Sequence, residues 1–303
     1  MTAAPTTWLN KRERGTIAGI RAVFVLATLF GRWPARLLVR VIALYYALFD
    51  KKAVRASKEW FTVVHGRPAR WRDAYRHILR FSQMTLDRLF LLRGKTRPFR
   101  FTHTGHELLE RHAKERTGAI LVGAHLGSYE AMRAGGEGTR LPLNIVGYFA
   151  NARLINALFE KLNPSLAARV IHIGDGSIDF IFQIKERIAA GEMVALLADR
   201  AGLNENTTTV PFFGRPARFA TGPFILASLL NCPVYLTFGL YTEPNRYDLY
   251  CEPFAERLVL PRKDRQRALE AEVLRYAQRL EHYCRKAPDN WSNFFDFWSL
   301  QVP

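Results

Sequence analysis

Residues 119–130 read AILVGAHLGSYE, and this stretch predicts the fold of the chain. Its first six residues are a short apolar run that follows a glycine, which is the pattern of a buried β-strand. Beyond the run come His125 and then Ser128, a residue type that commonly caps a helix. A buried strand that leads directly into a helix is the repeating unit of an α/β sheet.

The same alternation continues along the rest of the chain. Further apolar runs are predicted to be strands at residues 143–149, 170–174, 194–198, 233–240 and 247–253. Helical patterns occur at residues 69–92, 152–162, 178–190, 221–230 and 266–285. Near-continuous apolar strands that alternate with helices predict an α/β fold with a mainly parallel or mixed central sheet covered by helices. We therefore expect one α/β domain over residues 69–303.

The N-terminal third carries almost all of the net charge. The 303 residues include 44 Lys and Arg against 27 Asp and Glu, and the first 100 residues hold 21 of the basic and five of the acidic ones. A formal net charge of +17 predicts an anionic partner, either nucleic acid or a membrane. The basic residues are interleaved with apolar stretches and form no known nucleic-acid-binding motif. The sequence therefore favours an anionic membrane surface and no nucleic acid.

Residues 1–68 are predicted to be a basic, apolar helical region that associates with a membrane. The longest stretches without a charge are residues 22–31 and 41–49, whereas a spanning helix needs about 20 apolar residues. We expect two helices separated at Trp33-Pro34, because proline disfavours continuation of a helix. A helical hairpin packed on the rest of the protein and a single tilted spanning helix are the alternatives.

The second of these helices has two different faces. Arg36 and Arg40 share one face, and apolar side chains recur near helical spacing on another: Leu37, Leu38, Val41, Ile42, Tyr45 and Leu48. A helix that is apolar on one side and basic on the other is typical of the headgroup region of an anionic membrane. This pattern predicts peripheral or monotopic attachment.

His125 and Glu130 are the candidate catalytic pair. The strand delivers His125 to the carboxyl edge of the sheet, where sites in such folds gather, and Glu130 falls in the first turn of the following helix. A carboxylate that holds one imidazole nitrogen leaves the other nitrogen to accept a proton from a hydroxyl. Among the eight histidines, only His125 has an acid at this spacing. The pattern therefore predicts a general base with an orienting acid.

Cysteines and the other histidines indicate neither a metal nor a cofactor. The cysteines lack metal-type spacing and are predicted to be buried and reduced: Cys232, Cys251 and Cys284. One histidine group lacks a convincing fourth zinc ligand: His103, His106 and His112. The absence of a Gly-x-Ser-x-Gly elbow argues against an α/β-hydrolase.

Several short motifs occur in the order in which one enzyme superfamily carries them. His125-x4-Glu130 looks like the first conserved block of the lysophospholipid acyltransferase superfamily, and Asp199-Arg200 resembles the second. Residues 210–217 (VPFFGRPA) with 222–227 (GPFILA) resemble a block of its lipid A late acyltransferase branch. The segments at 8–16 and 291–298 (WSNFFDFW) are similar to a predicted-acyltransferase subgroup of that branch.

The resemblance implies transfer of a fatty acyl group from a thioester to a hydroxyl or amine of a lipid or glycolipid acceptor. The donor would be acyl carrier protein or coenzyme A. His125 would act as the general base and Glu130 as its orienting acid. The resemblance also implies a place at the cytoplasmic face of a bacterial inner membrane. A catalytically idle membrane scaffold and a nucleic-acid-binding protein are the rival hypotheses.

Other residues of these motifs are candidate substrate-binding residues. Arg200, Arg215 and Arg169 could bind phosphate on the donor or acceptor through forked hydrogen bonds, with a structural ion pair as the alternative for each. Asp199 is expected to orient Arg200 or a loop, and Gly214 to form a turn over packed aromatic side chains. The aromatic residues of 291–298 could line an acyl groove, face headgroups or pack in the core. The acceptor stays open between a lipid A precursor, another glycolipid, an aminoacyl lipid and a polyene-type lipid.

Overall fold

A computed structural model describes residues 17–135, 141–147, 169–173, 178–200 and 206–298. Its centre is a seven-stranded sheet in the order β1-β9-β8-β2-β5-β3-β4. The strands are β1 (Arg100–Thr104), β2 (Ala119–Gly123), β3 (Leu143–Gly147), β4 (Val170–His172), β5 (Met193–Leu197), β8 (Val234–Thr242) and β9 (Arg246–Ala255). From β8 to β4 all neighbours are parallel, whereas β9 is antiparallel to β8. The predicted α/β class with a mainly parallel, mixed sheet is confirmed.

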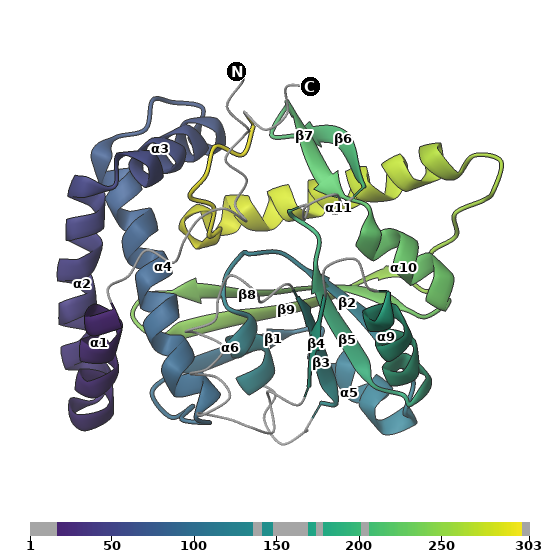
Figure 1. Cartoon of the computed structure of the whole chain (residues 1–303), viewed down its shortest axis with the longest axis horizontal. Coiled ribbons are helices and arrows are strands. Elements are labelled where there is room, and N and C mark those ends of the chain that lie inside the picture. The colour runs from purple at the N-terminus through teal and green to yellow at the C-terminus, as the bar shows by residue number, and fades with distance from the viewer. Residues whose placement is uncertain (1–16, 136–140, 148–168, 174–177, 201–205, 299–303) are drawn as a thin grey trace.

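Helices cover both faces of this sheet (Figure 1). They are α1 (Ile17–Phe30), α2 (Arg32–Phe49), α3 (Lys51–His65), α4 (Trp71–Leu92), α5 (His106–Glu115), α6 (Tyr129–Ala134), α9 (Asp179–Ala189), α10 (Gly222–Leu230) and α11 (Arg265–Lys286). Successive strand residues point to opposite faces. Ile120 and Val122 therefore join the core beneath α10 and α11, while Leu121 joins a second cluster that contains Leu109 of α5.

All six predicted strands are present, as are the helices expected at 69–92, 178–190, 221–230 and 266–285. The helix expected at 152–162 lies outside the described residues. Strand β1 was not predicted, because four of its five residues are exposed and it carries no apolar run. The hairpin of β6 (Thr207–Phe212) and β7 (Arg215–Ala220) was also not predicted as strands. Its turn at Phe213 and Gly214 does confirm the expected turn over a buried aromatic residue, Phe212.

Helices α2 and α3 pack against α4, and α1 packs against α2, on one side of the sheet (Figure 1). The break between α1 and α2 falls at Gly31, whose φ of 82° favours glycine. Pro34 therefore lies in the first turn of α2, where no helical hydrogen bond is lost. Within the described part of the chain, we find no helix that is both long and apolar enough to cross a bilayer. The predicted boundary between residues 1–68 and 69–303 stays a prediction.

Helix α2 turns a charged side inward. Arg32 and Arg36 are buried, and Arg36 donates hydrogen bonds of 2.7 Å to the Tyr241 hydroxyl and to the Glu243 carboxylate. Only Arg40 of the expected basic face is exposed. The opposite face is apolar, as predicted, and more than half exposed at Trp33, Leu37, Val41, Tyr45, Leu48 and Phe49. The arginine side expected to meet headgroups is therefore largely occupied by contacts within the protein.

Candidate active site

The loop between β2 and α6 carries the candidate base. Strand β2 ends at Gly123, and the chain runs through His125 to Ser128, which caps α6 by accepting a hydrogen bond of 3.2 Å from the Ala131 amide. Glu130 lies in the first turn of α6. The predicted placement of these two residues, one beyond the strand and one at the start of the helix, is confirmed.

A glycine sets the path of this loop. Gly127 has a φ of 79°, and a Cβ atom there would lie 2.0 Å from the carbonyl oxygen of Gly239 in β8. Only glycine fits a left-handed backbone at such a close approach. The amide of Ser128 also donates to the Gly239 carbonyl over 2.8 Å, so the loop is held against β8.

His125 is hydrogen-bonded to Asp199, which follows β5. Parallel pairing sets Gly123 of β2 opposite Leu197 of β5, so the residues two positions beyond each strand meet at one edge of the sheet. Nδ1 of His125 lies 2.9 Å from Oδ1 of Asp199. The Asp199 side chain is fully buried, whereas 31% of the His125 side chain is exposed. A buried carboxylate therefore holds an imidazole that reaches the surface.

Trp291 completes the hydrogen bonding of Asp199. Its indole Nε1 donates to Oδ2 of Asp199 over 2.9 Å, so both carboxylate oxygens are engaged. Burial alone would raise the pKa of Asp199, but contacts with His125, the charge of Arg200 and the indole hydrogen bond hold that pKa well below its usual value. Asp199 is therefore ionised at neutral pH.

Residues 290–292 form a strap across the loop of His125. The amide of Gly127 donates to the carbonyl of Asn290 over 2.9 Å, and the amide of Ser292 donates to the carbonyl of His125 over 2.8 Å. These bonds flank an isolated bridge between Leu126 and Trp291. The strap therefore fixes the backbone of His125, while the side chain of Trp291 holds Asp199.

Core packing accounts for three aromatic residues of the C-terminal motif. Trp291, Phe297 and Trp298 are buried, and all three rings lie near the buried ring of Phe212. The ring of Trp60 from α3 is centred 4.5 Å from that of Trp291. The core-packing alternative therefore applies to these three residues rather than an acyl groove or headgroup contact.

Glu130 makes its described contacts with other groups. Its carboxylate pairs with Nε of Arg88 from α4 and lies 3.4 Å from the Ser128 hydroxyl. The spacing predicted that Glu130 would hold one ring nitrogen of His125. In the structure it is Asp199 that lies beside Nδ1 of His125. The contact between His125 and Glu130 therefore stays a prediction.

The surroundings of His125 favour its neutral form. Burial lowers the pKa of His125, and so does the charge of Arg200, whereas the carboxylate of Asp199 acts in the opposite direction. Because a carboxylate only accepts hydrogen bonds, Nδ1 carries the proton of the neutral ring. Nε2 is then the basic nitrogen, as general-base catalysis requires.

Arg200 is the predicted binding residue that lies closest to this pair. Its Nε lies 3.8 Å from Oδ2 of Asp199, its guanidinium donates to the carbonyl of Ser292, and it stacks over the ring of Phe295. Only 11% of the Arg200 side chain is exposed. Asp199 and Arg200 lie side by side at the strand end, and the substrate-binding roles expected of both stay predictions.

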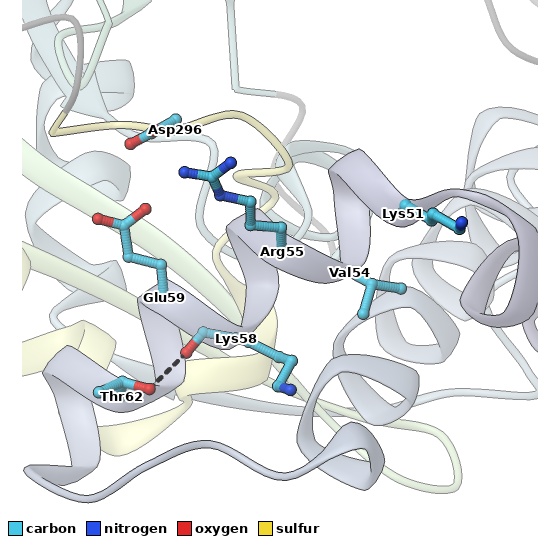
Figure 2. A pocket seen from close by; sticks show the side chains of 7 residues that line it. All are labelled: Lys51, Val54, Arg55, Lys58, Glu59, Thr62 and Asp296. Atoms are coloured by element: carbon cyan, nitrogen blue, oxygen red, sulfur yellow. Dashed lines mark hydrogen bonds between the residues drawn. The ribbon is translucent and has the colours of Figure 1, made fainter.

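Arg215 lies beside a separate groove. It follows Gly214 in the β6–β7 hairpin, stacks over Trp298 and has a nitrogen 3.7 Å from the carboxylate of Glu59 in α3. The groove has a volume of about 590 Å³ and is lined by Lys51, Val54, Arg55, Lys58, Glu59, Thr62 and Asp296. Figure 2 shows Arg55 and Glu59 on the side of α3 that faces Asp296. Burial, followed by the nearby Asp296 carboxylate, raises the pKa of Glu59.

Arg169 is not brought to the candidate base. It precedes β4 and pairs with Glu192, which precedes β5, over 3.4 Å. Both residues therefore lie at the amino ends of parallel strands, whereas His125 and Asp199 lie beyond the carboxyl ends. The structure thus separates Arg169 from Arg200.

The cysteines are buried, as predicted, and all three are free thiols. Across the described ranges, no group of three Cys, His, Asp or Glu side chains is arranged to hold a metal ion. His112, one of the weak zinc candidates, is instead hydrogen-bonded to Thr117 over 2.6 Å and to Tyr235 over 2.7 Å.

Sequence analysis missed two features of the site. The bond between His125 and Asp199 joins residues 74 positions apart, and the bond between Asp199 and Trp291 joins residues 92 apart. The placement of Asp199 beyond a parallel strand was the signal for the first. Nothing in the sequence distinguishes the indole of Trp291 from its aromatic neighbours.

Comparison with known families places most of the chain in a described family. A family model described as bacterial lipid A biosynthesis acyltransferase matches residues 85–299, which is more than two thirds of the chain. The matched stretch includes His125, Glu130, Asp199 and Trp291. A search of curated proteins found no match.

Proposed function

Because the chain belongs to the bacterial lipid A biosynthesis acyltransferase family, it is an acyltransferase, and we propose how it carries out acyl transfer. A fatty acyl group moves from a thioester, carried by acyl carrier protein or coenzyme A, to a hydroxyl or amine of a lipid or glycolipid acceptor. The single observation that carries this proposal is the bond between partly exposed His125 and buried Asp199. An oriented neutral imidazole is the group that deprotonates such an acceptor.

The reaction needs one base and no bond to the protein. Nε2 of His125 takes the proton of the acceptor as its oxygen or nitrogen attacks the thioester carbonyl. The tetrahedral intermediate then collapses, the carbon–sulfur bond breaks, and the leaving thiolate receives the proton from the imidazolium. The products are an ester or amide and a free thiol.

Two carboxylates support the base in this scheme. Asp199 keeps the proton of the neutral ring on Nδ1 and stabilises the imidazolium that forms during transfer, as the buried hydrogen bond supports. Glu130, as the acid of the His-x4-Glu motif, orients the loop of His125 through its ion pair with Arg88 and its contact with Ser128.

Cationic groups bind the charged parts of the substrates. Arg200 lies next to the proposed base and interacts with an anionic group of the donor or acceptor. The rim of the groove beside Arg215 carries three basic side chains, Lys51, Arg55 and Lys58, together with two carboxylates, Glu59 and Asp296 (Figure 2). A partner of opposite charge is steered to such a rim, which supports it as the approach for an anionic donor.

The protein attaches to a membrane in a peripheral or monotopic manner, at the cytoplasmic face of a bacterial inner membrane. The exposed apolar face of α2 supports this placement, because large apolar patches on monomers commonly mark interaction sites. A lipid acceptor also resides in a membrane. The anionic leaflet complements the net charge of +17.

The test is an acyl-transfer assay with a labelled acyl thioester and extracted membrane lipids, combined with lipid mass spectrometry of a deletion strain. The His125→Ala variant should lose roughly 10²- to 10⁴-fold in kcat while keeping its melting temperature. The deletion strain should lack one acyl increment in one lipid, which identifies the acceptor. A folded His125→Ala protein with wild-type turnover would instead support the idle scaffold.

A further inference from the structure

A buried histidine of α4, His77, touches the strap at the carbonyl oxygen of Trp291. His77 of α4 places Nε2 2.6 Å from the carbonyl oxygen of Trp291 and Nδ1 3.0 Å from the hydroxyl of Ser57 in α3. All three residues have no measurable exposure to solvent. His77 therefore joins two helices of the N-terminal part of the chain to the strap.

The partners of His77 determine its proton position. A carbonyl oxygen only accepts, so Nε2 must carry the hydrogen, and Nδ1 accepts from the Ser57 hydroxyl. Burial lowers the pKa of His77 to about 4, although the contact with Trp291 and the charge of Asp289 act in the opposite direction. His77 is therefore neutral at pH 7 and donates a hydrogen bond to one peptide group.

The residue that His77 holds is the one that reaches the active site. The main chain of Trp291 lies between the two strap bonds to the loop of His125, and its indole donates to Asp199. If the Trp291 peptide rotated to find another donor, the indole would move with it. The direction of the Asp199 carboxylate would then change relative to His125.

We propose that His77 is a positioning residue for acyl transfer, which acts through Trp291 to align Asp199 with His125. This inference rests on the proposed role of His125 as the base. It assigns α3 and α4 a function in the chemistry, since Ser57 and His77 come from these helices. Trp60 of α3 reinforces the link by donating to the carbonyl of Pro288, just before the strap, over 2.8 Å.

Substitutions at position 77 separate positioning from folding. In His77→Gln the amide nitrogen lies near the place of Nε2 and can donate to the Trp291 carbonyl, whereas in His77→Asn it reaches only the place of Nδ1. We expect His77→Gln to keep kcat within about threefold, and His77→Asn and His77→Leu to lose about tenfold or more, with KM little changed. The matched control is His112→Leu, which removes another buried histidine with two hydrogen bonds but no link to the strap.

The second measurement is the titration of the His125 ring by nuclear magnetic resonance, which does not depend on activity. The charged groups that act on His125 are Asp199 and Arg200. Because Asp199 raises the pKa of His125, a weaker contact should lower that pKa in His77→Asn and His77→Leu. The pKa should be unchanged in His77→Gln and His112→Leu.

The outcomes distinguish this inference from the proposed function. If His77→Leu does not fold, the comparison of His77→Gln with His77→Asn tests the role of His77 instead. Equal kcat values and equal His125 titrations in these two variants would overturn the role of His77. If His125→Ala kept its turnover while the position-77 variants still shifted the His125 titration, the proposed function would fail and the structural coupling would stand.

Discussion

Arg32 of α2 and Asp87 of α4 form a bidentate ion pair that is shielded from solvent. Nε of Arg32 lies 2.7 Å from Oδ1 of Asp87, and Nη2 of Arg32 lies 2.8 Å from Oδ2 of Asp87. The pair fixes the rotation of α2 about its own axis, because the charged side must face α4. The apolar side of α2 is thereby turned outward.

The ion pair should contribute strongly to stability. In Arg32→Leu the Asp87 carboxylate stays buried without its partner, so we expect the free energy of unfolding to fall by about 3–5 kcal/mol. The matched control is Arg40→Leu on the same helix, where the side chain is 51% exposed and lies 3.9 Å from Glu243. Arg40→Leu should lower the free energy of unfolding by at most about 1 kcal/mol. Denaturant unfolding measures the free energy of unfolding of both variants. Equal losses would show that the buried ion pair contributes no more to stability than the exposed arginine does.

The outward face of α2 should bind lipid. Leu37→Ser combined with Val41→Ser removes two exposed apolar side chains, so we expect vesicle affinity to fall by roughly tenfold or more. Leu229→Ser, at an equally exposed position on α10, is the control and should leave binding unchanged. Sedimentation with vesicles containing anionic lipid measures the effect. Unaltered binding by the double variant would place membrane contact elsewhere.

Asp199 should matter more for turnover than Glu130. Asp199→Asn removes the charge that stabilises the imidazolium of His125, and we expect kcat to fall roughly 10²- to 10⁴-fold. Glu130→Gln should lose less, because Glu130 contacts Arg88 and Ser128. Steady-state kinetics with the labelled thioester gives both values. A larger loss of kcat in Glu130→Gln than in Asp199→Asn would instead identify Glu130 as the acid that orients His125.

Arg200 should control the pH dependence of the reaction. Burial and the charge of Arg200 lower the pKa of His125, so the acid limb of kcat/KM should lie below 6.5, the ordinary value for histidine. Arg200→Gln removes one cause of the lowering and should therefore move the limb to higher pH. Arg200→Lys retains the charge and should leave the limb in place, but loses the planar fork and should raise KM for the anionic substrate. A limb that stays fixed in Arg200→Gln would show that Arg200 does not act on the base.

The sheet could be predicted because its strands are simple apolar runs. Strands β2 and β5 are buried on both faces, so their composition alone identifies them. Strand β1 could not be predicted in the same way, since its sequence RFTHT is mostly exposed and pairs only with β9 in the described part of the sheet. The edge of a sheet is determined by partners distant in sequence rather than by its own residues.

The active site was partly predictable for the same reason. The local spacing singled out His125 and Glu130 as candidates, whereas the bond between His125 and Asp199 was not predicted. Which acid contacts Nδ1 depends on the register of β2 against β5, and a sequence pattern does not contain that register. The burial of Arg36 was equally hidden, because its partner Glu243 is 207 residues away.

The strap also imposes an order on the making of the enzyme. A ribosome releases the N-terminal helices first, then the segments that carry His125 and Asp199, and only later the segment that holds Trp291. Oδ2 of Asp199 gains its indole donor only after Trp291, 92 positions further along the chain, has been synthesised. The apolar face of α2 therefore emerges before the contacts around His125 are complete, so synthesis itself delays activity until most of the protein has emerged.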